Sequence, residues 1–194
     1  MAGLPLPALA DCLTRADLAQ GLRATYMDGS VVDYRAAGDD LVQVTETPDI
    51  KAQKAVRFVS RYGIYDLSAQ GLLGGVPQPD QVLEYSYADS AGHAPPAPEP
   101  GAVWLGESTT NYVDGTLQSA VAVMVFGTES TLRLGGCDYA SVPVTASYLS
   151  GEDWTAQDYD WLSDLGIGIL TRREGSEAAR PSAYRVTGLA RLQP

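Results

Sequence analysis

Hydrophobic and polar residues alternate along most of this chain with the period of two that is typical of β-strands. Leu22, Ala24 and Tyr26 alternate with polar neighbours, and Asp28-Gly29 then supplies a hairpin turn. Similar runs follow at residues 31–34, 41–45, 56–61, 64–67, 82–87, 103–105, 109–113, 116–126, 130–134, 142–148, 165–170 and 183–192. The pattern predicts a mainly β protein, a twisted antiparallel sheet or half-barrel of about ten strands with one or two short helices.

A short helix is expected near the N-terminus. Thr14 and Asp17 have the spacing of a shortened capping box, and Gly21 marks the end of the helix. Residues 71–79 are rich in glycine and proline and are expected to form a loop.

The length of 194 residues fits a single domain, which we place at residues 11–194. A Pro-rich segment, residues 89–101, is expected to form an exposed loop between two similar halves. Both halves contain a Tyr-x-Asp-Gly-[Ser/Thr] hairpin, at residues 26–30 and 112–116. The repeat is compatible with a duplication or with two independent tight turns.

The N-terminus and the cysteines point to export. Ala8-Leu9-Ala10 has the form of a signal-peptidase site, so we expect residues 1–10 to be a signal-peptide remnant or a disordered leader. Cys12 and Cys137 are the two cysteines, and neither belongs to a Cys-x-x-Cys motif. An even count predicts one disulfide between them in a periplasmic or secreted protein, and two buried free thiols are the alternative.

The net charge and its distribution along the chain exclude some classes of binding partner. The net charge is −11, and residues 62–132 contain no Lys or Arg. This distribution excludes a basic stripe for nucleic acid or for an anionic membrane surface. No apolar run approaches the roughly 20 residues of a membrane span. The acidic stretch indicates either solubility or a face for a cation or a basic partner.

No motif specifies a reaction. The single histidine, His93, lies in the Pro-rich loop, where a Ser–His–Asp site would be poorly held. Residues 71–75 lack the Lys-[Ser/Thr] of a phosphate-binding loop. We therefore predict no catalytic residues, no metal and no cofactor.

An acidic and aromatic segment, residues 152–164, is the candidate site. Its ligand-binding candidates are Trp154, Tyr159, Trp161, Asp158 and Asp160. Tryptophan faces stack on sugars and paired carboxylates hydrolyse glycosides, so a carbohydrate-binding or carbohydrate-acting role is one interpretation. Clustered carboxylates also suit Ca²⁺, although the spacing matches no EF-hand loop. The third interpretation is a solvated acidic loop that covers one end of the sheet.

Three features of the second half resemble exported bacterial β proteins of uncharacterised function, which are related in shape to the outer-membrane lipoprotein carriers. They are Val142-Pro143-Val144, residues 161–166 (WLSDLG) and Arg172-Arg173. The resemblance covers about a third of the chain, and it implies a curved sheet around a helix or an apolar cavity, without catalytic residues. We therefore expect an exported, non-enzymatic envelope protein that binds an apolar small molecule or an envelope protein. The alternatives are the carbohydrate role and a purely structural envelope module.

Overall fold

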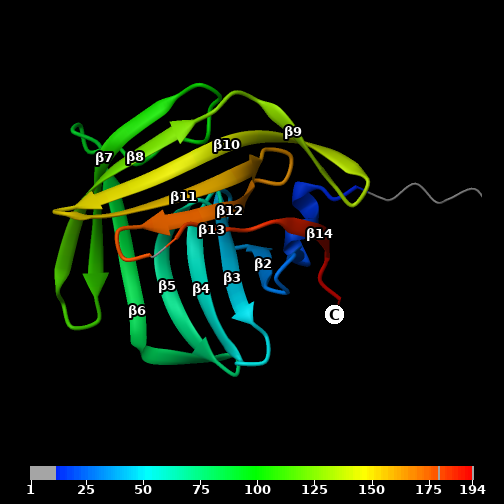
Figure 1. Ribbon diagram of the computed structural model, residues 1–194, viewed down its shortest axis with the longest axis horizontal. Helices are drawn as coiled ribbons and strands as arrows, with labels where there is room; N and C mark the ends of the chain where they lie inside the picture. Colours follow the sequence, from blue (N-terminus) through cyan, green and yellow to red (C-terminus); the bar gives the residue numbers. More distant parts are fainter. Residues whose placement is uncertain (1–11, 179, 194) are drawn as a thin grey trace, which may run out of the picture.

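The computed structural model describes residues 12–178 and 180–193, so the expected leader at residues 1–10 lies outside the described residues. Figure 1 shows one large antiparallel sheet that curves strongly on itself, which confirms the predicted fold class. The described part of the chain contains one helix, a short 3-10 helix, and no helix with the length and hydropathy needed to cross a membrane.

The chain orders its elements as follows: η1 (Arg15–Ala19), β1 (Leu22–Tyr26), β2 (Val31–Ala36), β3 (Leu41–Asp49), β4 (Lys54–Arg61), β5 (Tyr65–Leu73), β6 (Val76–Ala88), β7 (Val103–Tyr112), β8 (Leu117–Phe126), β9 (Ser130–Leu134), β10 (Cys137–Ser150), β11 (Asp153–Leu162), β12 (Ile167–Gly175), β13 (Ser182–Ala183) and β14 (Val186–Arg191). Most neighbours in the sheet are also neighbours in the chain, as in a meander. β9 departs from this order and pairs only with the first part of β10.

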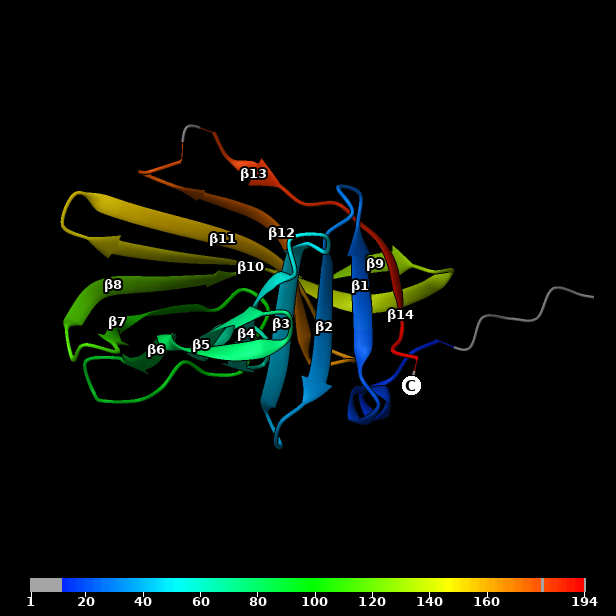
Figure 2. The ribbon, with the colours of Figure 1, turned by 90° about the horizontal axis from the view of Figure 1, so that it is seen from below.

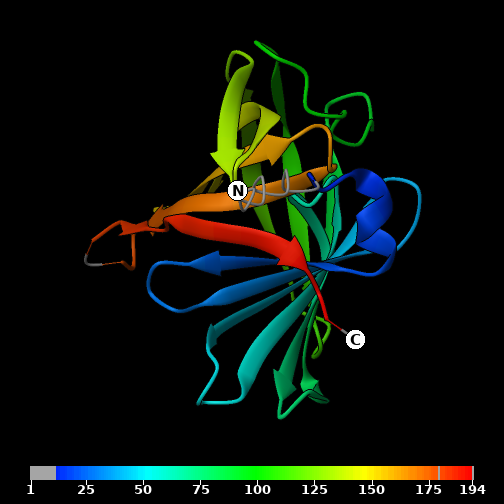
Figure 3. The same ribbon diagram turned by 90° about the vertical axis from the view of Figure 1, so that its right-hand side faces the viewer.

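The two end strands of the sheet, β13 and β14, follow each other in the chain. β13 pairs with β12, and β14 pairs with β1. The Tyr184 amide donates to the Thr171 carbonyl oxygen, whereas the Met27 amide donates to the Arg185 carbonyl oxygen. The C-terminal segment therefore changes partner between residues 184 and 185 and lies beside both β12 and β1 (Figure 3). The sheet stays strongly curved without becoming a closed barrel.

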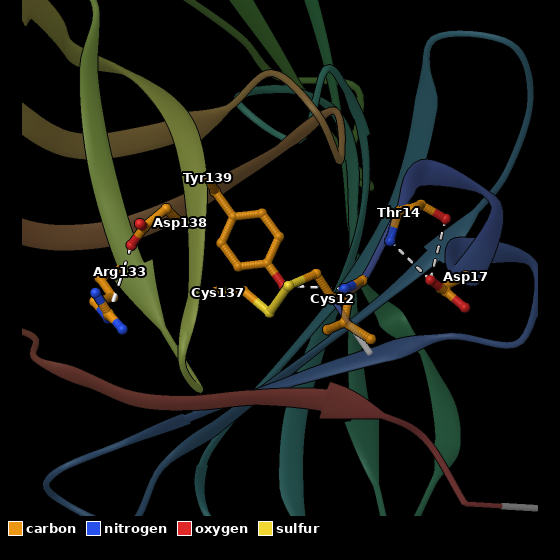
Figure 4. Close-up of a disulfide and its surroundings, with 8 residues drawn as sticks. Cys12, Thr14, Asp17, Arg133, Cys137, Asp138 and Tyr139 are labelled. Carbon is orange, nitrogen blue, oxygen red and sulfur yellow. Dashed lines mark hydrogen bonds and ion pairs between the residues drawn. A yellow bond between two sulfur atoms is a disulfide. The ribbon is translucent and has the colours of Figure 1, made fainter. Parts of the chain in front are cut away.

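The N-terminal segment is fastened to the start of β10. The predicted disulfide is present: Cys12 and Cys137 are bonded, with their Cα atoms 5.6 Å apart. Beside it, the Leu13 amide donates to the Tyr139 hydroxyl at 3.1 Å. Figure 4 shows the disulfide next to the Tyr139 ring, with η1 beginning just beyond Cys12. These contacts hold the short helix against the end of the sheet.

The helix and both Asp-Gly hairpins form where the sequence predicts them. The Asp17 carboxylate accepts the Thr14 amide at 2.7 Å, so the capping interaction is confirmed. Asp28 and Asp114 each accept the amide two residues later, at 3.0 and 2.9 Å, and the glycines that follow have positive φ. An aspartate that bonds forward and a glycine with positive φ together make a tight turn.

One predicted loop is wrong, and so is the interpretation of the candidate segment as a loop. Residues 71–79 belong mostly to β5 and β6, which are joined by a tight turn at Gly74-Gly75 where both φ values are positive. The acidic and aromatic segment is strand β11, paired with β10 on one side and β12 on the other. Polar side chains did not prevent strand formation, because the backbone hydrogen bonds of β11 are satisfied on both edges.

Buried side chains gather in two cores. The first lies between η1, β1–β3, the start of β10 and β12, and the second lies between β5, β7, β8, β10 and β11. β12 contributes to both, because Ile167 and Ile169 belong to the first core and Leu170 belongs to the second. Of the strand predicted at residues 165–170, residues 167–170 lie in β12, and all six residues are buried.

Pro143 lies inside β10, where a proline usually costs a backbone hydrogen bond. Its carbonyl oxygen accepts the Gly127 amide, on the side of β10 where the partner changes from β9 to β8. In an extended strand the N–H and C=O of one residue point to the same side. The donor that proline lacks is therefore missing at a gap between two partner strands, where no ladder bond is lost.

Candidate functional site

A cavity of about 290 Å³ opens between strands β5, β6, β7, β8, β10 and β11, on the side of the curved sheet where Figure 2 shows these strands fanning out from the rest. Its volume lies just below the usual range of small-molecule sites, which begins at about 300 Å³. Of the described residues that line it, one has an aliphatic side chain, Ala120. The others are aromatic, hydroxylic, amide or acidic: Asp66, Tyr85, Tyr87, Ser108, Thr110, Gln118, Tyr148, Ser150, Asp153, Trp154, Thr155 and Gln157.

Tyrosines form the aromatic wall of this cavity. Tyr85 and Tyr87 are two residues apart on β6, so strand alternation turns both toward the same face. The ring centroid of Tyr87 lies 6.5 Å from that of Tyr148 on β10 and 6.2 Å from that of Tyr65 on β5. Tyr62 continues the row at 6.2 Å from Tyr65. The row connects the cavity to the second core.

Asp66 is the half-buried carboxylate of the cavity. The Ser60 hydroxyl donates to its Oδ1 at 2.5 Å. The pKa of Asp66 is raised to about 7, mainly by burial and also by the nearby Glu46, whereas the Ser60 hydrogen bond and Arg173 oppose the rise. Desolvation dominates because it disfavours the charged form more than one hydroxyl can stabilise it. Asp66 therefore changes its charge near neutral pH.

Arg173 does not neutralise Asp66 directly. Its Nη2 lies 3.4 Å from Glu46 Oε1, so the pair joins β12 to β3 across the interior. At the other end of the cavity, the Ser176 hydroxyl donates to Asp153 Oδ1 at 3.0 Å. Neither Asp66 nor Asp153 forms an ion pair with any residue that the structure describes.

The five candidates from the acidic and aromatic segment lie on two faces of β11. Tyr159 and Trp161 face the second core, where Tyr159 is buried. Asp158 and Asp160 alternate with them and point to the opposite face. Trp154 borders the cavity, but its pairing with Leu149 places its side chain on that opposite face too. The strand therefore does not gather the five side chains in one place.

The two aspartates have partners on their own face. The Thr145 hydroxyl donates to Asp158 Oδ1 at 2.7 Å, and Arg172 Nη1 lies 3.6 Å from Asp158 Oδ2. Burial raises the pKa of Asp160, and the nearby Ser141 hydroxyl opposes this effect. Their contacts are those of a cross-strand polar network.

An exposed apolar patch covers the face opposite the cavity. We call it the outer patch, and its residues are paired across β7, β8, β10 and β11: Val103, Leu105, Val121, Val125, Leu149 and Trp154. Leu105, Val121 and Leu149 line a wide groove of about 810 Å³, which Asp89 and Glu107 also line. A contiguous exposed apolar face of this kind is typical of an interaction site.

The sequence argument missed Asp66, Tyr85, Tyr87 and Tyr148. One local signal was available, because Asp66 lies between Ile64-Tyr65 and Leu67 and so places a carboxylate among apolar neighbours. The Tyr-x-Tyr spacing of Tyr85 and Tyr87 was a second signal, since it places both rings on one face. Nothing local indicates that these residues meet Tyr148.

Within the described residues, no three His, Cys, Asp or Glu side chains come together as a metal site. His93 lies in the Pro-rich loop, where its Nδ1 is 3.3 Å from Asp89 Oδ2, and it is not among the cavity residues. No family model, curated protein or solved structure matches this chain significantly. The functional argument therefore depends on the geometry of the cavity and of the outer patch.

Proposed function

We propose that this chain is an exported, non-enzymatic envelope protein that binds a small ligand in the tyrosine-lined cavity. The observation that carries the proposal is the cavity itself, which combines three tyrosines with a ring of polar groups. The expected resemblance to carriers with a curved sheet around a cavity supports the same function. The Cys12–Cys137 disulfide supports a periplasmic or secreted location, because such bonds persist in oxidising compartments.

The lining favours an amphipathic ligand over the wholly apolar one expected from the sequence. Tyrosine rings offer flat apolar surfaces, and hydroxyl and amide groups surround them. A fully aliphatic ligand would leave these polar groups unpaired, which is unfavourable. A carbohydrate is the alternative ligand, and the presence of both Asp66 and Asp153 in one cavity favours it.

Native mass spectrometry of protein purified from its own organism tests the proposal. We expect a small-molecule adduct on the wild-type protein. Ala120→Trp fills the cavity and should abolish the adduct, whereas Val121→Trp, one residue along β8 on the opposite face, should retain it. An adduct that survives Ala120→Trp, or a wild-type protein without one, contradicts the proposal. A sugar mass would support the carbohydrate alternative.

A protein partner is the second candidate function, and the outer patch supports it. The groove along the patch contains Asp89 and Glu107, and the net charge of −11 opposes pairing with a second copy. The complementary partner is a basic segment with interspersed apolar side chains. We expect a Lys/Val-alternating peptide to change Trp154 fluorescence and a Glu/Val peptide to have no effect.

Substitutions in the outer patch and in the cavity show which of the two surfaces binds the peptide. Val121→Ser should weaken binding of the Lys/Val peptide, and Asp66→Asn, which changes a residue that lines the cavity and not the groove, should not. Equal binding by Val121→Ser and the wild-type protein would exclude the outer patch. A patch that binds the peptide in a protein without any cavity ligand would favour the purely structural envelope module.

A further inference from the structure

The cavity has a negative charge that nothing within it balances. Its charged lining residues are Asp66 and Asp153, and no Lys or Arg of the described chain is among the lining. The wider sequence around it agrees, since residues 62–132 contain no basic side chain. A ligand that enters this cavity therefore meets carboxylates without a cationic competitor.

The charged groups next to the cavity lining leave the cavity negatively charged. Arg173 is the basic group close to Asp66, and it is paired with Glu46 at 3.4 Å. One arginine thus faces two carboxylates, Glu46 and Asp66, and Asp153 adds a third negative charge in the cavity lining. The groups that face Asp66 from the surrounding strands are Glu46 on β3, Ser60 on β4, Tyr85 and Tyr87 on β6, Tyr148 on β10, Tyr159 on β11 and Arg173 on β12.

The aromatic wall adds a second attraction for positive charge. Tyr85, Tyr87 and Tyr148 line the cavity together with Asp66. The faces of aromatic rings carry a negative quadrupole, which attracts ammonium groups, and the attraction grows when water is excluded. Rings and carboxylates in one small cavity are the elements of a site for organic ammonium ions.

We propose that the cavity binds a small organic cation, a quaternary ammonium or a protonated amine, between the tyrosine wall and the Asp66 and Asp153 carboxylates. This inference rests on the proposed small-ligand function and specifies the chemical class of the ligand. The volume of about 290 Å³ admits a compact ammonium head group. The hydroxyl and amide groups of the rim then bind polar substituents of the ligand.

The inference predicts the sign of the pH dependence. Burial raises the pKa of Asp66 to about 7, so this carboxyl is mostly neutral at pH 6 and mostly charged at pH 8. A cation binds the charged form better, and its binding lowers the pKa of Asp66 in return. Affinity for a permanently charged ligand should therefore rise between pH 6 and pH 8.

Two ligands of nearly identical shape test the inference. Choline carries a permanent positive charge, and 3,3-dimethyl-1-butanol is its neutral counterpart. By isothermal titration calorimetry at pH 8 and fixed ionic strength, we expect choline to bind at least about tenfold more tightly than the alcohol. At pH 6 this ratio should be smaller, because Asp66 is then mostly neutral while Asp153 and the tyrosine rings still attract the cation.

Matched variants assign the effect to the cavity. Asp66→Asn should lower choline affinity at pH 8 and remove its pH dependence, while affinity for the alcohol stays the same. Glu84→Gln removes a charge from the same strand as Tyr85, on an exposed position of the other face, and should change neither. Circular dichroism confirms that both variants are folded.

The possible outcomes test the cation proposal independently of the proposed small-ligand function. Equal binding of choline and the alcohol overturns the cation inference and leaves a small-ligand cavity in place. Absence of choline binding also overturns the inference. In that case the proposed function is decided independently by the native adduct and its loss in Ala120→Trp.

Discussion

The Tyr34 hydroxyl donates to the Gly168 carbonyl oxygen at 3.0 Å, and this bond joins β2 to β12 across 134 residues of sequence. Tyr34 is almost completely buried, at 1% exposure. The bond connects the two walls of the curved sheet that Figure 1 shows facing each other. It therefore contributes to the curvature that creates the cavity.

Replacing Tyr34 by Phe should lower the free energy of unfolding by about 1–2 kcal/mol, because a buried acceptor loses its donor. Urea denaturation measures this change. Tyr112→Phe is the matched control, since the Tyr112 hydroxyl bonds Gln118 on the surface. We expect the control to cost less than about 0.5 kcal/mol. If the two variants lost the same free energy of unfolding, the buried hydrogen bond would contribute no more to stability than the surface one.

Gly168 permits a close backbone approach between β12 and the turn before β5. A Cβ atom at residue 168 would lie 2.8 Å from the Gly63 carbonyl oxygen and 3.0 Å from Ile64 Cγ1. Gly168→Ala must therefore displace backbone, and we expect a loss of about 1–3 kcal/mol in thermal or urea unfolding. Gly188→Ala, whose Cβ would meet nothing within 4 Å, should be nearly neutral. A neutral Gly168→Ala would contradict the observed packing.

The Cys12–Cys137 disulfide closes a loop with a sequence separation of 125 residues. In the chain-entropy model such a loop stabilises the folded state by about 4–5 kcal/mol. We expect reductant to lower the melting temperature clearly. Alkylation followed by mass spectrometry should label no cysteine before reduction and both cysteines after it. Labelling without reductant would exclude the disulfide in the purified protein.

Asp66 should make stability depend on pH. Its pKa is about 7 in the folded protein and close to 3.8 when unfolded, so the folded state binds a proton that the unfolded state releases between these values. Stability therefore falls as pH rises from about 4 to about 7, by roughly 2–4 kcal/mol from this group. Asp66→Asn should be more stable than wild type at pH 8.

The same variant should lose this advantage near pH 4, where wild-type Asp66 is neutral in the folded state. Melting temperatures at the two pH values measure the difference, with Glu84→Gln as the control. An advantage that is independent of pH would contradict the raised pKa. Together with the binding experiment, the expected result describes a carboxylate that destabilises the fold and serves a ligand.

Local patterns were sufficient for the features that depend on near neighbours. Asp28 and Asp114 define tight turns because each bonds an amide two residues ahead, and the glycine that follows accepts positive φ. The Thr14–Asp17 cap is equally local. The disulfide was predictable for a different reason, because a chain with two cysteines has one possible internal pairing.

The candidate site was not predictable in this way. Trp154, Asp158 and Tyr159 are close in sequence, yet alternation along β11 sends Tyr159 to one face and the other two to the opposite face. Asp66 and Tyr148 are 82 residues apart by their numbers, and they share a cavity because β5 and β10 lie on opposite walls of the curved sheet.

The alternation of polar and apolar residues thus determines that the chain forms strands, where it turns and which side chains share a face of each strand. Tertiary structure alone decides which strands face each other, because the twist of each strand accumulates over the whole sheet and no single segment specifies the sum. The acidic and aromatic segment still contributes to the cavity, because Asp153, Thr155 and Gln157 line it. The chemistry of the cavity comes from Asp66 and the tyrosines, which the curved sheet brings together from β5, β6 and β10.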